Sequence, residues 1–392
     1  MRAIFKNLLF ILVAMPILTL TSCKDDDEPC TESTWYQDSD GDGLGNPDVS
    51  VSACEQPDGY VSNDDDDDDT GSTGALDCTE YTGYDLVECL ANSFLGTLSS
   101  SQLDEAQLTY SVSTAQEWSN LPVGNVPRPG IGLEDLSTTQ LAAAKALLVA
   151  ASGETENEGY DEMMQTLNAD DYLNNVGGNG YGSGLYYLAI LGTPSSSGTW
   201  EVMFGGHHYA FGNTYTDGEL VAGTPSFRGI EPFGTFTWDG ESNQPLNQEQ
   251  EAFAALLQSF SDSELATAKL SGSWSDILGG PGEDDNFPST YSGIKVSALS
   301  DSQKELVKTA IKTYVLDITD ADAVLIYETY VDELDETYVA YSGTTGVETV
   351  GDYVRIDGPS VWIEYSVQNG IILSDPHPHS VWRDKGNDYG GN

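Results

Sequence analysis

The spacing of apolar residues predicts amphipathic helices over much of the chain beyond residue 78. From Asp85 to Leu98, apolar side chains recur every three or four residues, the interval that places them on one face of a helix. An Ala/Leu-rich segment ends near Ala151, and similar patterns follow at 251–260, 304–318 and 321–341. These segments predict a layer of helices that packs one face on a core.

Three of the predicted helices begin with similar residues, at Leu136–Gln140, Leu246–Gln250 and Leu299–Gln303. In the first, Ser137 and Gln140 have the spacing of a capping box, in which both side chains bond free backbone donors at the helix start. The similarity could mean an internal repeat. Because the remaining residues of the helices diverge, we interpret it as shared capping chemistry.

β-Structure is predicted in the middle and at the end of the chain. The β-rich or alternating segments are 185–190, 200–215, 223–227, 353–356, 361–367 and 371–373. A central, largely antiparallel sheet that combines them, with helices packed around it, is an α+β fold. The sequence has neither βαβ alternation nor a Gly-rich phosphate loop, which argues against a nucleotide-binding fold.

Composition divides the chain into a small N-terminal part and one large domain. The predicted segments are a signal peptide (1–22), an acidic tether (23–29), an Asp-rich module (30–70), a linker (71–77) and an α+β domain (78–392). The last segment is long enough to bury a sizeable core.

The N-terminus has the pattern of an export signal. Arg2 and Lys6 flank the start of an apolar run that is too short to span a bilayer. The run ends in Leu20–Cys23, which resembles the lipobox of bacterial lipoproteins and implies an acylated, membrane-anchored Cys23. The acidic residues 24–28 resemble the signal that sends some Gram-negative lipoproteins to the outward face of the outer membrane. As bare chemistry they are a solvated charge run.

Charge and cysteine content fit an exported protein. The chain has 64 acidic and 14 basic residues, a formal net charge of −50, which argues against binding to nucleic acid. Apart from Cys23, the cysteines are Cys30, Cys54, Cys78 and Cys89, an even set that predicts two disulfides in an oxidising compartment. Proximity favours Cys30–Cys54 and Cys78–Cys89, although other pairings are open.

The Asp-rich module contains a candidate calcium loop. Asp38, Asp40 and Asp42 alternate ahead of a glycine, as in the first half of an EF-hand loop, but Val49 stands where the closing Glu is expected. The run at 64–69 could supply further oxygens. The segment resembles Asp-rich bacterial metal-binding repeats, similar in style to thrombospondin type 3 repeats, which implies a calcium-binding stalk. An acidic spacer without calcium is the alternative.

The four histidines of the chain form two pairs, His207–His208 and His377–His379. Residues two apart on a strand share a face, so the second pair can bind one ion together. Adjacent residues point to opposite faces, although the glycines before the first pair could distort the strand. We predict a zinc or copper site that combines His377, His379 and one of the first pair, with the fourth histidine facing substrate. Four buried histidines bonded to backbone carbonyls are the alternative.

Other polar residues are candidates for catalysis. Arg383 and Arg128 could each hold a carboxylate or phosphate group of a substrate, although in so acidic a chain both could instead pair with structural carboxylates. Glu231 is the best carboxylate for a general base or metal ligand. Asn213 could orient a bound group.

Several segments carry a family resemblance. They are Trp118–Pro122, Arg128–Gly130, Phe204–His208, Asn213, Thr224–Phe227, Glu231–Pro232 and His379–Asp384. Together they resemble the bacterial family catalogued as domain of unknown function 3500, over residues 80 to 392. The resemblance implies that this region is one unit and supplies no activity.

Two functions are consistent with these residues. The first is a surface-anchored, metal-dependent hydrolase or oxidoreductase acting on an extracellular small molecule, glycan or peptide, in which the ion activates water or polarises a substrate oxygen. The second is a non-catalytic lipoprotein that holds a metal or ligand. The sequence does not separate the two functions well, and of the two we favour the enzyme.

Calcium removal tests the Asp-rich module. A segment so poor in apolar residues needs an ion or a disulfide to fold. We therefore expect a chelator to lower the protease resistance of residues 30–70, and calcium to restore it. Identical digestion with and without calcium would count against a calcium module.

Overall fold

The computed structural model describes residues 32–38, 45–57, 59–64 and 76–391. Cys23, Cys30, Asp40 and Asp42 lie outside the described residues. Strands β1 (Ser33–Gln37), β2 (Asn46–Ala53) and β3 (Tyr60–Val61) form a small sheet in the order β2-β1-β3. Cys54, at the end of β2, is disulfide-bonded, and the partner expected for it, Cys30, is among the residues not described.

The large domain contains one twelve-stranded sheet of order β13-β14-β15-β16-β17-β10-β8-β7-β6-β4, with β5 beside β6 and β9 beside β8. Its strands are β4 (Gln107–Leu108), β5 (Ile131–Gly132), β6 (Tyr187–Leu191), β7 (Thr199–Gly205), β8 (Tyr209–Thr216), β9 (Glu219–Ala222), β10 (Ser226–Gly229), β13 (Ile294–Lys295), β14 (Tyr338–Ser342), β15 (Tyr353–Asp357), β16 (Val361–Asn369) and β17 (Pro376–Asp384). Apart from the parallel β4–β6 pair, the pairings between these strands are antiparallel. The predicted α+β fold is confirmed.

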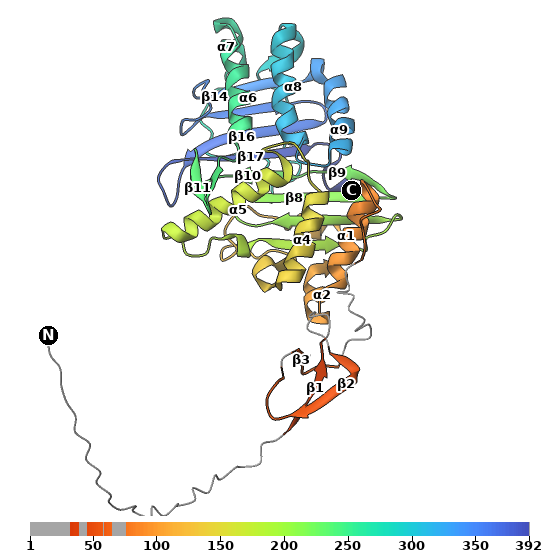
Figure 1. Ribbon diagram of the computed structural model, residues 1–392. Coiled ribbons are helices and arrows are strands. Elements are labelled where there is room, and N and C mark those ends of the chain that lie inside the picture. Colours follow the sequence, from red (N-terminus) through yellow and green to blue (C-terminus); the bar gives the residue numbers. More distant parts are fainter. Residues whose placement is uncertain (1–31, 39–44, 58, 65–75, 392) are drawn as a thin grey trace, which may run out of the picture.

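Helices cover one face of this sheet (Figure 1). They are α1 (Tyr84–Gly96), α2 (Ser100–Ala106), α4 (Thr138–Ala150), α5 (Gly159–Val176), α6 (Asn247–Gln258), α7 (Asp262–Ala268), α8 (Asp301–Val315) and α9 (Asp320–Asp332). The short helix α3 (Val112–Ala115) and the hairpin β11 (Phe236–Trp238)–β12 (Glu241–Asn243) lie in connections. Among the described residues, no helix combines the length and hydrophobicity needed to cross a membrane.

The capping prediction is confirmed at two of its three positions. Ser137 with Gln140, and Ser300 with Gln303, form complete capping boxes at the starts of α4 and α8. The prediction is wrong at Leu246, which precedes α6 in a left-handed conformation and makes no side-chain cap. The helix predicted at 321–341 is also wrong at its end, because α9 stops at Asp332 and the following apolar residues form β14 inside the sheet.

The large domain is built from two halves of the same architecture. From the β10–β17 junction outward, the sheet reads β10-β8-β7-β6-β5 on one side and β17-β16-β15-β14-β13 on the other. Matching contacts recur: the Gln140 side-chain amide donates to the Thr97 carbonyl in the first half, and that of Gln303 donates to the Ser259 carbonyl in the second. The internal repeat, which the divergent sequences had argued against, is therefore real.

Each half has its own apolar core under its helices. One cluster packs α1, α4 and α5 on β6–β8, and the other packs α6, α8 and α9 on β14–β17. Alternate strand residues face opposite sides, so Leu188 and Ile190 enter the helix-side core while Ala189 and Leu191 join a third cluster on the other face. Loops cover that second face, and the sheet is buried on both sides.

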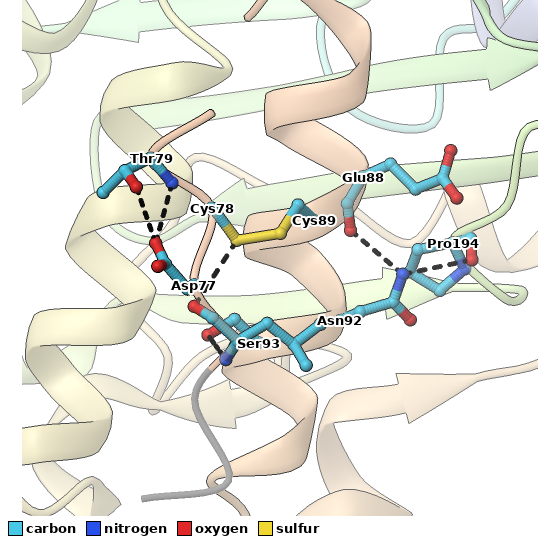
Figure 2. Close-up of a disulfide and its surroundings, with 9 residues drawn as sticks. Asp77, Cys78, Thr79, Glu88, Cys89, Asn92, Ser93 and Pro194 are labelled. Atoms are coloured by element: carbon cyan, nitrogen blue, oxygen red, sulfur yellow. Dashed lines mark hydrogen bonds between the residues drawn. A yellow bond between two sulfur atoms is a disulfide. The ribbon is translucent and has the colours of Figure 1, made fainter. Parts of the chain in front are cut away.

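The predicted Cys78–Cys89 disulfide is confirmed (Figure 2). It ties the segment before α1 to the second turn of that helix. Nearby, the Leu76 amide donates to the Ser93 hydroxyl, and Asn92 donates to the Pro194 carbonyl in the β6–β7 loop. The start of the domain is thus fastened to α1, and α1 to the sheet.

Glycine substitutions test the repeat. Gly130 and Gly293 occupy equivalent positions with φ of 100° and 105°, and a Cβ on either would collide with a carbonyl, of Leu188 or Val339 respectively. Gly234 has φ 104° and open space around it. We expect Gly234→Ala to lower the free energy of unfolding by about 1–3 kcal/mol, because the alanine strains the backbone. The other two variants should lower it clearly more, because a collision with the carbonyl adds to this strain. Urea unfolding measures this, and equal losses in all three would contradict it.

Candidate metal centre

The two histidine pairs meet because their strands are neighbours in the sheet. His207 and His208 form the turn between β7 and β8, and His377 and His379 lie at the start of β17. Strand β10 lies between β8 and β17, and its last residue, Gly229, donates its amide to the His208 carbonyl and pairs with His379. A Cβ on Gly229 would lie 2.9 Å from the Cδ2 atoms of both rings, so glycine leaves the space that they fill.

Three of the four rings converge on one point. The Nε2 atom of His377 lies 2.7 Å from Nε2 of His208 and 3.1 Å from Nε2 of His379. These residues are all buried, with exposed fractions of 2–8%. The ligand atoms of the three lie within 4.8 Å of one another. The structure thus brings together the predicted combination, and His208 is the member from the first pair.

His208 reaches this point because the chain does not continue as a regular strand through the turn. His208 has φ 68°, a left-handed conformation that is uncommon for residues other than glycine. Its amide donates to the Asn120 carbonyl in the loop that covers this face. The turn rotates His208 toward β17 and leaves His207 beside it, which explains how adjacent residues serve the same region.

Burial keeps the rings of His208 and His377 neutral. It lowers the pKa of His208 well below the ordinary value, and the neighbouring histidines lower it further. Burial, followed by the charges that His379 and His207 would carry, lowers the pKa of His377 to about 3. A neutral ring presents a nitrogen lone pair, which is the form that binds a metal.

Polar groups orient the rings from behind. The Nδ1 atom of His379 lies 3.1 Å from Oδ1 of Asp276 and 2.9 Å from Nε2 of Gln368. A carboxylate bonded to the far nitrogen of a metal-binding histidine fixes the ring and strengthens the ligand. Asp276 therefore has the position of an orienting group for His379.

Glu231 lies behind His377 and has a different role from the one expected. Its carboxylate accepts hydrogen bonds from the backbone amides of residues 371–373 in the turn between β16 and β17. One oxygen is 3.8 Å from Nδ1 of His377. Glu231 fixes the turn that presents His377, and it has no contact with the point where the three Nε2 atoms meet.

His207 belongs to a separate set of contacts. Its Nδ1 atom lies 2.7 Å from Oδ1 of buried Asp170, and its ring stacks on His208 with centroids 3.5 Å apart. Tyr181 meets the ring edge-on at 4.7 Å. The fourth histidine, expected to face substrate, is instead only 7% exposed.

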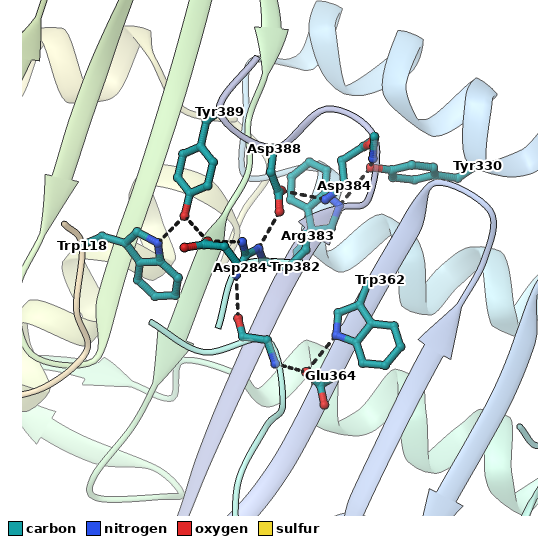
Figure 3. Close-up of polar contacts among 12 residues, drawn as sticks. Trp118, Asp284, Tyr330, Trp362, Glu364, Trp382, Arg383, Asp384, Asp388 and Tyr389 are labelled. Carbon is teal, nitrogen blue, oxygen red and sulfur yellow. Dashed lines mark hydrogen bonds and ion pairs between the residues drawn. The ribbon is translucent and has the colours of Figure 1, made fainter. Parts of the chain in front are cut away.

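Arg383, expected at the site, is engaged elsewhere (Figure 3). Its guanidinium donates to Asp388 and to Asp284, both at 2.6 Å, and to the Gly279 carbonyl at 3.0 Å. It is four residues beyond His379, about 13 Å along the strand. In a chain so rich in carboxylates, internal acids and a backbone carbonyl engage all three nitrogens of the guanidinium, which is thereby fixed away from the histidines.

Arg128 and Asn213 do not line the site either. Arg128 donates to the Val126, Leu121 and Gly206 carbonyls, so it braces the covering loop against the turn that carries His207. Asn213 lies five residues beyond His208, about 17 Å along β8. Its amide donates to the Ala151 carbonyl on the helix side of the sheet.

Comparison with known families identifies the domain. Residues 82–391 match the family described as "Protein of unknown function (DUF3500)". The chain belongs to this family. No curated protein and no solved structure matches the chain.

Two carboxylates that contact the histidines of this DUF3500 domain, Asp170 and Asp276, were not among the residues predicted from the sequence. Asp170 lies in the middle of α5 and has no local signal, because only the packing of α5 on the β7–β8 turn brings it to His207. Asp276 had a signal: Trp274–Ile277 repeats the pattern of Trp118–Leu121, with Asp in place of Asn. Both segments reach the histidines from the covering loops.

Substitution of Arg383 tests its structural role in the DUF3500 domain. Arg383→Met leaves Asp284 and Asp388 without their partner, and we expect a loss of about 3–5 kcal/mol in unfolding free energy with unchanged metal content. Lys304→Met, which removes an exposed pair with Asp335, is the control and should cost under about 1 kcal/mol. Loss of metal from the Arg383 variant would place this arginine in the site after all.

Proposed function

We propose that this protein is a metal-dependent enzyme whose centre is formed by His208, His377 and His379. The observation that carries the proposal is the convergence of three buried Nε2 atoms at 2.7 and 3.1 Å. At such a distance, two neutral imidazole nitrogens can share at most one proton. Nitrogen ligands at about 2.0–2.1 Å from one ion, by contrast, lie roughly 3 Å from each other. A bound cation accounts for all three lone pairs at once.

The donor set favours zinc or copper. Three imidazole nitrogens and no carboxylate at the meeting point suit these borderline metals better than calcium or magnesium, which prefer oxygen. Three protein ligands leave a position for water or substrate. There the ion polarises a substrate oxygen or lowers the pKa of bound water toward neutrality, and copper would also support oxidation.

The surroundings restrict the substrate. Arg383 and Arg128 are occupied by internal acceptors, and the chain has a formal charge of −50, so an anionic group has little to bind it. We therefore propose a neutral or cationic substrate, a small molecule, glycan or peptide, for a hydrolase or oxidoreductase. The same charge argues against nucleic acid as a partner.

A second candidate function is to hold the metal without turnover. The observation in its favour is the burial of all three rings. Two surface hollows of about 380 Å³, near Cys89 and near Met164, have no histidine in their linings. A closed centre would store or present an ion and would exclude substrate.

The N-terminal sequence supports a place for this protein outside the cell. We propose that Cys23 is acylated and holds the chain on the outward face of a Gram-negative outer membrane. We further propose that Asp38, Asp40 and Asp42 bind calcium in a stalk between the anchor and the DUF3500 domain. The support is the lipobox and the alternation of aspartates in the sequence.

Elemental analysis tests the centre. Protein purified without a histidine tag should contain at least one zinc or copper ion per chain, and the His208→Ala and His377→Ala variants should each contain less metal than the wild type. Asn213→Ala, outside the site, is the matched control and should retain it. Equal metal content in all four proteins would end the proposal.

Cobalt substitution separates the enzyme from the closed site. With an open position, azide should change the visible spectrum of the Co²⁺ protein, because it replaces the bound water. A spectrum that azide leaves unchanged would favour the non-catalytic function, and a substrate screen would then lose its rationale.

A further inference from the structure

A second group of metal-binding side chains adjoins the three-histidine centre. Asp170, His207 and His208 each place a ligand atom within 4.8 Å of the other two, and all three residues are buried. They come from α5 and from the β7–β8 turn. His208 is thus common to this group and to the three-histidine centre.

One ring nitrogen of His208 takes no part in the three-histidine centre. Nε2 of His208 faces His377, while its Nδ1 atom is buried and has no hydrogen-bond partner among the described residues. A buried polar atom without a partner is unfavourable, and a bound ion would satisfy it. The His207 ring stacks on the His208 ring, and the carboxylate of Asp170 lies 2.7 Å from Nδ1 of His207, so both residues adjoin His208.

We propose that the protein binds a second divalent transition-metal ion at Asp170, His207 and His208, so that the His208 ring bridges two ions. This inference rests on the proposed function, because the bridge needs the first ion at Nε2. A neutral imidazole carries one N–H proton, and that proton leaves to solvent when both nitrogens bind metal. The His207 ring binds through Nδ1 and keeps its own proton on Nε2.

Two negative groups offset half of the charge of such a pair. The carboxylate of Asp170 and the bridging imidazolate together offset the charge of one divalent ion. A set of two nitrogens and one oxygen suits zinc or copper, as the first site does. Nearby, Tyr186 donates to the His207 carbonyl and Gly206 bonds to the Tyr209 carbonyl, so the turn that carries both histidines is held in place.

Copper loading distinguishes one ion from two. A chelator first removes metal from the full chain, and excess calcium is then added to fill the oxygen sites. The protein is next loaded with Cu²⁺ and dialysed. We expect two copper ions per chain in wild type and one in Asp170→Asn and His207→Gln. Asp171→Asn, a neighbouring carboxylate outside the group, is the control and should keep two.

Electron paramagnetic resonance gives a second readout, which detects the bridge between the two ions directly. Two Cu²⁺ ions bridged by one imidazolate couple magnetically, so the wild-type signal should fall well below its copper content, and Asp170→Asn should show the full signal of a single ion. One copper per chain at full intensity, unchanged by Asp170→Asn, overturns the second site and leaves the first. No bound copper in wild type overturns both.

Discussion

The antiparallel pairing of β10 with β17 is the contact on which the rest of the domain depends. Four residue pairs, from Ser226–Trp382 to Gly229–His379, join two half-sheets into one. Each half has its own apolar core on the helix side, and the third cluster, on the other face, joins Phe227 of β10 with Val381 of β17 across this line. The histidines approach it from both sides, and the centre therefore exists only where the halves are joined.

The two halves share an architecture, yet only one of two equivalent hairpin ends carries imidazoles. The Gly229 amide donates to the His208 carbonyl, and in the other half the Lys385 amide donates to the Ser360 carbonyl in the same way. At that second end, Lys385 pairs with Asp357 and lies near three aromatic rings. A cation of the chain itself lies at this second end, whereas the equivalent end of the first half carries imidazoles.

The acidity of the chain decides what its few cationic side chains can do. Arg228, fully buried behind the junction, donates to Glu162 and Asp317, and Arg383 donates to Asp284 and Asp388. A buried guanidinium without a carboxylate would be strongly destabilising, as would these carboxylates without it. Internal pairing therefore occupies both of these guanidiniums.

The sequence by itself determined the features that depend on local spacing: the helical periodicities, the capping boxes at Ser137 and Ser300, the Cys78–Cys89 disulfide and the presence of two histidine pairs. Tertiary structure decided the rest. Only the strand order brings residues 208 and 377 into contact, only the left-handed turn selects His208 over His207, and only helix packing supplies Asp170. The apolar residues after Asp332 became a strand because the sheet buries them. Local patterns specify short-range hydrogen bonds and faces, whereas partners distant in sequence are chosen by the free energy of burying them together.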